Sequence, residues 1–155
     1  MRTLNNYLTE AGVVRRDTRL QNSKVKAKSW VHLIELTIKA IEENGSECDL
    51  NFIDVSNVDN MNSVFRFPET RMFNGDISGW DVSNVTNMQA MFEFSDFNGN
   101  ISHWDVSNVE NMERMFQNSK FKEDISKWTI KDNCNTYEMF KRCHIPNNHK
   151  PKNIL

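Results

Sequence analysis

Carboxylate, amide and hydroxyl side chains return at a fixed interval through the middle of the sequence, and they are the residues best suited to bind a partner. These groups donate and accept hydrogen bonds, and a column of carboxylates attracts a basic surface. The residues that we expect to contact another protein are, in chain order, Asp76, Ser78, Asp81, Asn100, Ser102, His103, Asp105, Asp124, Ser126 and Lys127. The pattern favours recognition over catalysis.

Calcium binding is an alternative for the same oxygen atoms, because a hard cation prefers carboxylate and hydroxyl ligands. Hydration alone also accounts for acidic columns on a surface, so we predict no metal site and no cofactor. Zinc is not indicated either, because Cys48, Cys134 and Cys143 lack a C-x-x-C spacing. Their odd number argues against a disulfide framework and suits a reducing compartment.

No catalytic arrangement is visible, so we predict that the protein is not an enzyme. The sequence contains no G-x-S-x-G segment and no phosphate-binding glycine loop. Cys143 and His144 are adjacent in the chain, a spacing that does not place a base against a nucleophile. The other histidines are scattered, at His32, His103 and His149.

Tryptophan also recurs every 24 residues, at Trp80, Trp104 and Trp128. These rings would form either an aromatic strip that grips a ligand or a part of the core. Ile77 lies three residues before Trp80, so the two side chains would face opposite ways in a strand with a period of two. The sequence leaves both interpretations open.

All these columns come from one internal repeat, which must position them. The segment D-V-S-N-V-T-N-M at residues 81–88 returns as D-V-S-N-V-E-N-M at 105–112, and an earlier copy occupies 54–61. The later interval is 24 residues and the first is 27, because three extra residues fall between Arg66 and Met72. A fixed period of this length is typical of stacked units that bury their apolar faces against one another.

Within each unit the pattern predicts a strand, a turn, a helix and a return loop. Residues 76–80 alternate polar and apolar as a short strand does, and the apolar residues of 85–92 follow a helical spacing. Ser83 stands where a helix N-cap belongs. Repeated asparagines such as Asn84 and Asn108 are expected to bond backbone groups of the neighbouring unit.

The copies FNGDISGWDVSNVTNMQAMF and FNGNISHWDVSNVENMERMF resemble the BspA-like branch of the leucine-rich-repeat family. The resemblance covers residues 48–140 and is nearest to short intracellular or phage-borne versions. It implies an α/β repeat solenoid, a leucine-rich-repeat-like stack of about four parallel strand–helix units with an N-terminal capping helix. It also implies protein binding, with the strand side as the binding wall.

The two ends depart from the repeat, so we divide the chain into an N-terminal segment with a capping helix (1–47), the repeats (48–140) and a basic tail or cap (141–155). Apolar residues at helical spacing predict a helix over Lys28–Asn44, stopped by Gly45 and covering a first strand over Asp49–Ile53. A short helix over Leu4–Ala11 is possible. The tail either wraps the last unit or is disordered.

Charge is segregated along the chain. Residues 49–140 carry 7 basic and 15 acidic side chains, a balance of −8, whereas residues 141–155 carry 4 basic and no acidic ones. An acidic body does not favour binding to phosphates, so we do not expect direct nucleic-acid binding by the repeats. A protein-binding module is the function expected, and an inhibitor that blocks a nucleic-acid-binding groove of a host protein is the alternative.

No signal peptide and no apolar run long enough to cross a membrane is evident in the sequence. We therefore expect a cytoplasmic protein that does not engage a membrane.

Overall fold

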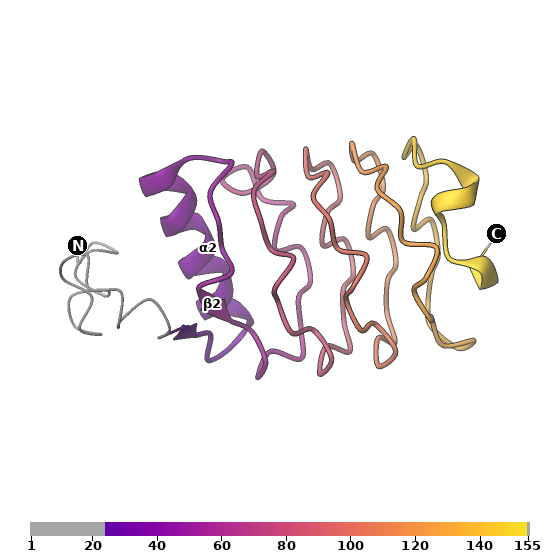
Figure 1. Cartoon of the computed structure of the whole chain (residues 1–155), viewed down its shortest axis with the longest axis horizontal. Coiled ribbons are helices and arrows are strands. Elements are labelled where there is room, and N and C mark those ends of the chain that lie inside the picture. The colour runs from indigo at the N-terminus through magenta and orange to yellow at the C-terminus, as the bar shows by residue number, and fades with distance from the viewer. Residues whose placement is uncertain (1–23, 155) are drawn as a thin grey trace.

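The computed structural model of the chain describes residues 24–154, which form a row of stacked coils (Figure 1). Helix α2 lies at one end of the row, and two short C-terminal helical turns lie at the other. The helix considered over Leu4–Ala11 lies outside the described residues.

The predicted N-terminal helix is confirmed as α2, which spans Trp30–Asn44. The Ser29 hydroxyl caps its first turn by accepting a hydrogen bond from the His32 backbone N–H. The helix ends at Gly45, whose φ of 87° lies in the region that favours glycine. The buried residues of the helix are Leu33, Leu36, Thr37 and Ala40, and α2 lies beside the first coil (Figure 1).

A two-stranded parallel sheet joins the N-terminal segment to the first coil. Strand β1 (Val25–Lys26) pairs with β2 (Ile53–Asp54), and Val25 lies opposite Ile53. Of the strand expected over Asp49–Ile53, only the last residue belongs to β2. The pairing places β1 where a preceding coil would lie.

The predicted α/β repeat solenoid of parallel strand–helix units is wrong. Among residues 24–154, α2 is the one α-helix, and β1 with β2 is the one sheet. From residue 55 to 146 the chain forms turns and loops, and isolated parallel bridges such as Asn87 with Asn111 link neighbouring coils. The sequence repeat is therefore a repeat of turns.

The repeat helix does not form because the backbone reverses its handedness inside it. Ala90 and Phe94 have φ angles of 52° and 59°, in the left-handed region. The N–H groups of Met88 and Ala90 donate at 2.8 Å to carbonyls of the next coil, those of Asn111 and Glu113, and not to a carbonyl four residues back. The same conformation recurs at Ser63, Arg114, Asn118, Glu138 and Arg142.

The repeat strand predicted over residues 76–80 is a tight turn. The Trp80 backbone N–H donates to the Ile77 carbonyl at 3.1 Å, which closes a four-residue turn. Both side chains therefore point inward: Trp80 is 3% exposed and Ile77 is 1% exposed. Because Ile77 and Trp80 lie in a turn, the alternation of side chains along a strand does not apply to them.

On one face of the coils, every second backbone N–H points along the stack towards its C-terminal end. Met88 donates to the Asn111 carbonyl and Met112 donates to the Asn135 carbonyl, both at 2.8 Å. Three further columns of backbone hydrogen bonds run in the same direction beside this one, and they include the bonds donated by Ala90, Phe92 and Phe94. We call this surface the ladder face, and it comprises residues 61–66, 88–94, 112–118 and 136–142.

Aromatic side chains stack along the axis and fill the core. Phe65, Phe92 and Phe116 lie nearly parallel, with ring centroids 5.3 and 5.5 Å apart, and each is fully buried. Such offset rings add to the free energy gained from apolar burial. Because each ring contacts the ring of the next coil, no single unit buries its own core.

The C-terminal segment wraps the last coil, which resolves the two alternatives considered for the tail. The Ile125 backbone N–H donates to the His149 carbonyl at 3.0 Å, and the Asn153 amide donates to the Ile130 carbonyl at 2.7 Å. The short helices η1 (Asn147–His149) and η2 (Lys152–Ile154) lie in this segment.

Candidate partner-binding edge

The ten residues predicted to bind a partner occupy equivalent turns of three successive coils. We call this set the acidic edge: Asp76, Ser78, Asp81, Asn100, Ser102, His103, Asp105, Asp124, Ser126 and Lys127. All ten are exposed or half-buried, whereas the residues that alternate with them, such as Ile77, Trp80 and Val82, are buried. The edge is thus the polar side of turns whose apolar side forms the core.

Each aspartate of the edge closes a turn with its own side chain. Asp76 Oδ1 accepts the Ser78 backbone N–H at 2.9 Å, and Asp81 Oδ1 accepts the backbone N–H and the hydroxyl of Ser83 at 3.1 and 2.6 Å. Such side-chain turns replace helix and strand hydrogen bonds locally. The prediction that Ser83 caps a helix is therefore wrong, because its hydroxyl donates to a carboxylate.

The same turn is built in every coil, with Asn or Asp as the acceptor. Asn100 Oδ1 accepts the Ser102 backbone N–H at 3.0 Å, and Asp124 Oδ1 accepts that of Ser126 at 2.8 Å. Asparagine and aspartate are interchangeable here because both present the same acceptor oxygen. The edge therefore holds its backbone in one conformation whether or not a given position is charged.

Hydrogen bonds favour the ionised form of three edge carboxylates, those of Asp76, Asp105 and Asp124. Hydrogen bonds from the Ser78 backbone and hydroxyl keep the pKa of Asp76 below its usual range. The Ser107 hydroxyl and backbone do the same for the pKa of Asp105, and those of Ser126 for the pKa of Asp124. The negative charge therefore persists to more acidic pH than that of an isolated aspartate.

Side-chain amides join the edge of one coil to the next. Asn84 Nδ2 donates to the Ser56 carbonyl at 2.9 Å, and Asn108 Nδ2 donates to the Ser83 carbonyl at 2.7 Å. The prediction that these asparagines bond backbone groups between units is confirmed. The edge is consequently braced along the stack as well as within each turn.

The tryptophan column belongs to the core and not to the edge. Trp104 and Trp128 are 5% and 4% exposed. Each indole Nε1 donates to a carbonyl of the preceding coil, Trp104 to Ile77 at 3.3 Å and Trp128 to Ile101 at 3.1 Å. The rings therefore fix the register of the edge from beneath and do not grip a ligand.

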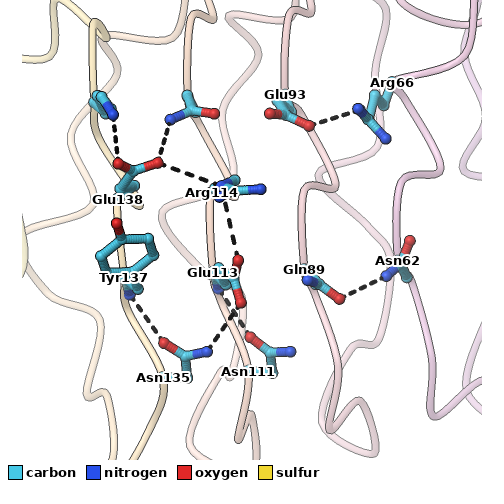
Figure 2. Close-up of polar contacts among 12 residues, drawn as sticks. Asn62, Arg66, Gln89, Glu93, Asn111, Glu113, Arg114, Asn135, Tyr137 and Glu138 are labelled. Atoms are coloured by element: carbon cyan, nitrogen blue, oxygen red, sulfur yellow. Dashed lines mark hydrogen bonds and ion pairs between the residues drawn. The ribbon is translucent and has the colours of Figure 1, made fainter.

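The ladder face carries a second polar network, which the sequence did not single out (Figure 2). Glu138 accepts hydrogen bonds from Arg114, Gln117 and Lys141, and these bonds lower its pKa to about 2, with Lys141 contributing most. Asn62 Nδ2 donates to Gln89 Oε1 at 3.0 Å in the same way between earlier coils. Side chains 21 to 27 residues apart thus meet, a proximity that only the stacking register creates.

Metal and redox sites find little support in residues 24–154. No group of three or more His, Cys, Asp or Glu side chains is placed to hold a metal ion there. Cys48, Cys134 and Cys143 are free thiols, and burial raises the pKa of Cys48 and Cys134. None of the helices in this part of the chain is long and apolar enough to span a membrane.

Residues 37–153 match the family described as "Mycoplasma protein of unknown function, DUF285". The chain belongs to the DUF285 family. This match confirms the family-level part of the resemblance to BspA-like repeat proteins. No curated protein and no solved structure matches the chain.

Proposed function

We propose that this DUF285 chain is a non-enzymatic module that binds another protein through the acidic edge. The observation that carries the proposal is the construction of the edge from self-closed turns in register, such as those of Asp76 and Asp105. A surface that is already rigid loses little conformational entropy on binding, so more of the contact energy becomes affinity. Ionised carboxylates at fixed positions favour a partner with a basic surface.

Asparagine substitution offers a sharp test because Asn100 already fills the turn of Asp76 in the third coil, and an asparagine at 81 or 105 would present the same acceptor oxygen as aspartate. We expect the triple variant Asp76→Asn, Asp81→Asn and Asp105→Asn to keep its fold and to lose partner binding. A control variant on the ladder face, Gln89→Ala with Glu113→Gln, should bind normally. The measurement is capture of partners from host extract, followed by association and dissociation rates of the captured protein.

The rates separate this proposal from a non-specific effect. Removing steering charges should slow association, while the dissociation rate changes less. If the edge variant captures and binds the partner as the unaltered chain does, or if only the ladder-face control loses binding, the acidic edge is not the binding surface.

Mimicry of nucleic acid is a second candidate, favoured by one observation. Asp54, Asp81 and Asp105 occupy the same turn of successive coils, and coils in such a stack are separated by about 5 Å. A column of this kind would fill a basic groove, as expected of an inhibitor carried by a phage against host defence. Duplex DNA should then displace the chain from the captured protein, and raising the salt concentration should weaken the complex steeply. A complex insensitive to both would exclude the decoy and leave the binding module.

A further inference from the structure

A shallow depression on the ladder side of the stack, apart from the acidic edge, combines apolar and basic side chains. It has a volume of about 310 Å³ and is lined by Arg66, Phe67, Pro68, Arg71 and Phe94. Phe94 is 52% exposed, although the neighbouring phenylalanines of the same coil, Phe92 and Phe97, are fully buried. An exposed ring beside a core of buried rings calls for an explanation other than packing.

The depression arises where the repeat is interrupted. The three extra residues of the first coil fall in the segment 66–72, which supplies all but one of the lining residues. Insertions in stacked repeats form loops on one face, and that face is often the one that binds. This loop is held in place, because the Phe67 carbonyl accepts the backbone N–H groups of Thr70 and Arg71 at 2.9 and 2.8 Å.

The backbone at Phe94 points to the same conclusion. Its φ of 59° is left-handed, a conformation that is costly for a bulky side chain and easier for asparagine. The corresponding residue of the next coil is Asn118, with a φ of 55°. Half of the Phe94 side chain is exposed, so this part of its ring is available for a ligand.

The arginines determine which ligand would fit. Arg66 Nε contacts the buried Glu93 carboxylate at 2.6 Å, which fixes the guanidinium at the rim of the depression. Arg71 is exposed and has no acidic partner within 4.0 Å in residues 24–154. Guanidinium groups bind carboxylates with two parallel hydrogen bonds and stack on aromatic rings.

We propose that this depression binds a peptide segment of a partner protein in which a carboxylate lies next to an aromatic side chain. The carboxylate would pair with Arg71, and the aromatic ring would pack between Phe67, Pro68 and Phe94. This site has the opposite charge to the acidic edge and does not depend on the function proposed for that edge. If the depression does not bind such a peptide, the function proposed for the acidic edge is unaffected. If the acidic edge does not bind a partner, the proposal for the depression is likewise unaffected.

Three blocked dipeptides serve as probes: N-acetyl-Asp-Phe-amide, N-acetyl-Asn-Phe-amide without the charge, and N-acetyl-Asp-Gly-amide without the ring. They are titrated into the full chain labelled with ¹⁵N, and backbone amide shifts are followed by NMR. We expect saturable shifts confined to residues 66–71 and 94 with the first peptide, at a Kd on the order of 1 mM for a ligand of this size. Each of the other two should bind weaker by roughly tenfold or more.

Two variants test the assigned residues. Phe94→Asn introduces the residue that the next coil tolerates at this place, so the fold should persist, and Arg71→Gln removes only the charge. Both should weaken binding of the first peptide by roughly tenfold or more, whereas Arg142→Gln, an exposed arginine outside the depression, should not. Amide spectra of the unbound variants verify the fold.

Several outcomes would overturn the proposal. Absence of saturation at about 10 mM peptide excludes a site of this kind. Equal binding of the uncharged peptide, or unchanged binding by either depression variant, removes the arginine or the ring from the site. Shifts at these residues that grow with protein concentration alone would assign the depression to contact with a second copy of the chain.

Discussion

At the scale of single residues, the feature that distinguishes this chain is a set of left-handed positions without glycine. Ser63, Ala90, Arg114 and Glu138 take this conformation at one place in the four coils, with φ between 52° and 58°. The conformation costs an ordinary residue roughly 1–2 kcal/mol. The conformation persists because the backbone N–H groups of Ser63, Ala90 and Arg114 each donate to a carbonyl of the next coil. A right-handed backbone would lose these hydrogen bonds.

Asn118 allows this cost to be measured, because its side chain makes no hydrogen bond in residues 24–154 while its backbone has a φ of 55°. We expect Asn118→Gly to change the free energy of unfolding by less than about 1 kcal/mol, since glycine accepts the conformation. Asn118→Val should destabilise by about 1–3 kcal/mol, since a β-branched side chain does not. Urea unfolding of both variants provides the comparison. Equal stabilities would mean that the left-handed backbone imposes no strain.

At the scale of elements, α2 does more than cover apolar surface. The indole Nε1 of Trp30 donates to the Asn62 carbonyl at 2.7 Å. In later coils the equivalent carbonyls, those of Gln89 and Glu113, accept a backbone N–H from the preceding coil. No coil precedes Asn62 within the described residues, so the indole supplies the hydrogen-bond donor that a preceding coil would have provided.

Replacing Trp30 by phenylalanine tests this cap while retaining an aromatic ring. We expect a loss of about 1–3 kcal/mol in the free energy of unfolding, because a half-buried carbonyl is left without its donor. Val31→Ala is the matched control on the same helix, since Val31 is 54% exposed and should tolerate the change. A Trp30→Phe variant as stable as the control would show that α2 acts through apolar contact alone.

At the scale of the whole molecule, the stack has two different ends. The columns of the ladder face all run in one direction, with N–H groups towards the C-terminal end. In the last coil, the backbone N–H groups of four residues therefore have no acceptor among residues 24–154: Thr136, Glu138, Phe140 and Arg142. The ladder face thus begins with a carbonyl capped by Trp30, that of Asn62, and ends with free donors.

Hydrogen exchange should reveal this polarity. The amides of Met112, Arg114, Phe116 and Asn118 donate to the last coil, so they should exchange only when the stack opens. The equivalent amides of the last coil lack acceptors and should exchange at least about 100-fold faster. Native-state exchange followed by NMR measures both sets in one sample. Comparable protection would mean that the last coil is covered by a further layer.

Residue types and their spacing are enough to define the repeat, its register and the chemistry of its columns. The 24-residue interval placed the residues of the acidic edge, and α2 followed from apolar spacing and a terminal glycine. These features are local, so residue type and spacing are enough to define them. Whether the edge binds a partner remains a prediction.

The fold of each unit, by contrast, depends on how the coils stack. The alternation of polar and apolar residues over 76–80 suits a strand, and the spacing of Met88 and Phe92 suits a helix, yet both segments form turns. The reason is that the backbone hydrogen bonds of the ladder face run between coils, so the stability of a turn depends on its neighbours and not on its own propensity. The interruption at residues 66–72 is visible in the sequence as three extra residues. That this segment and Phe94 line the same depression depends on how the coils stack.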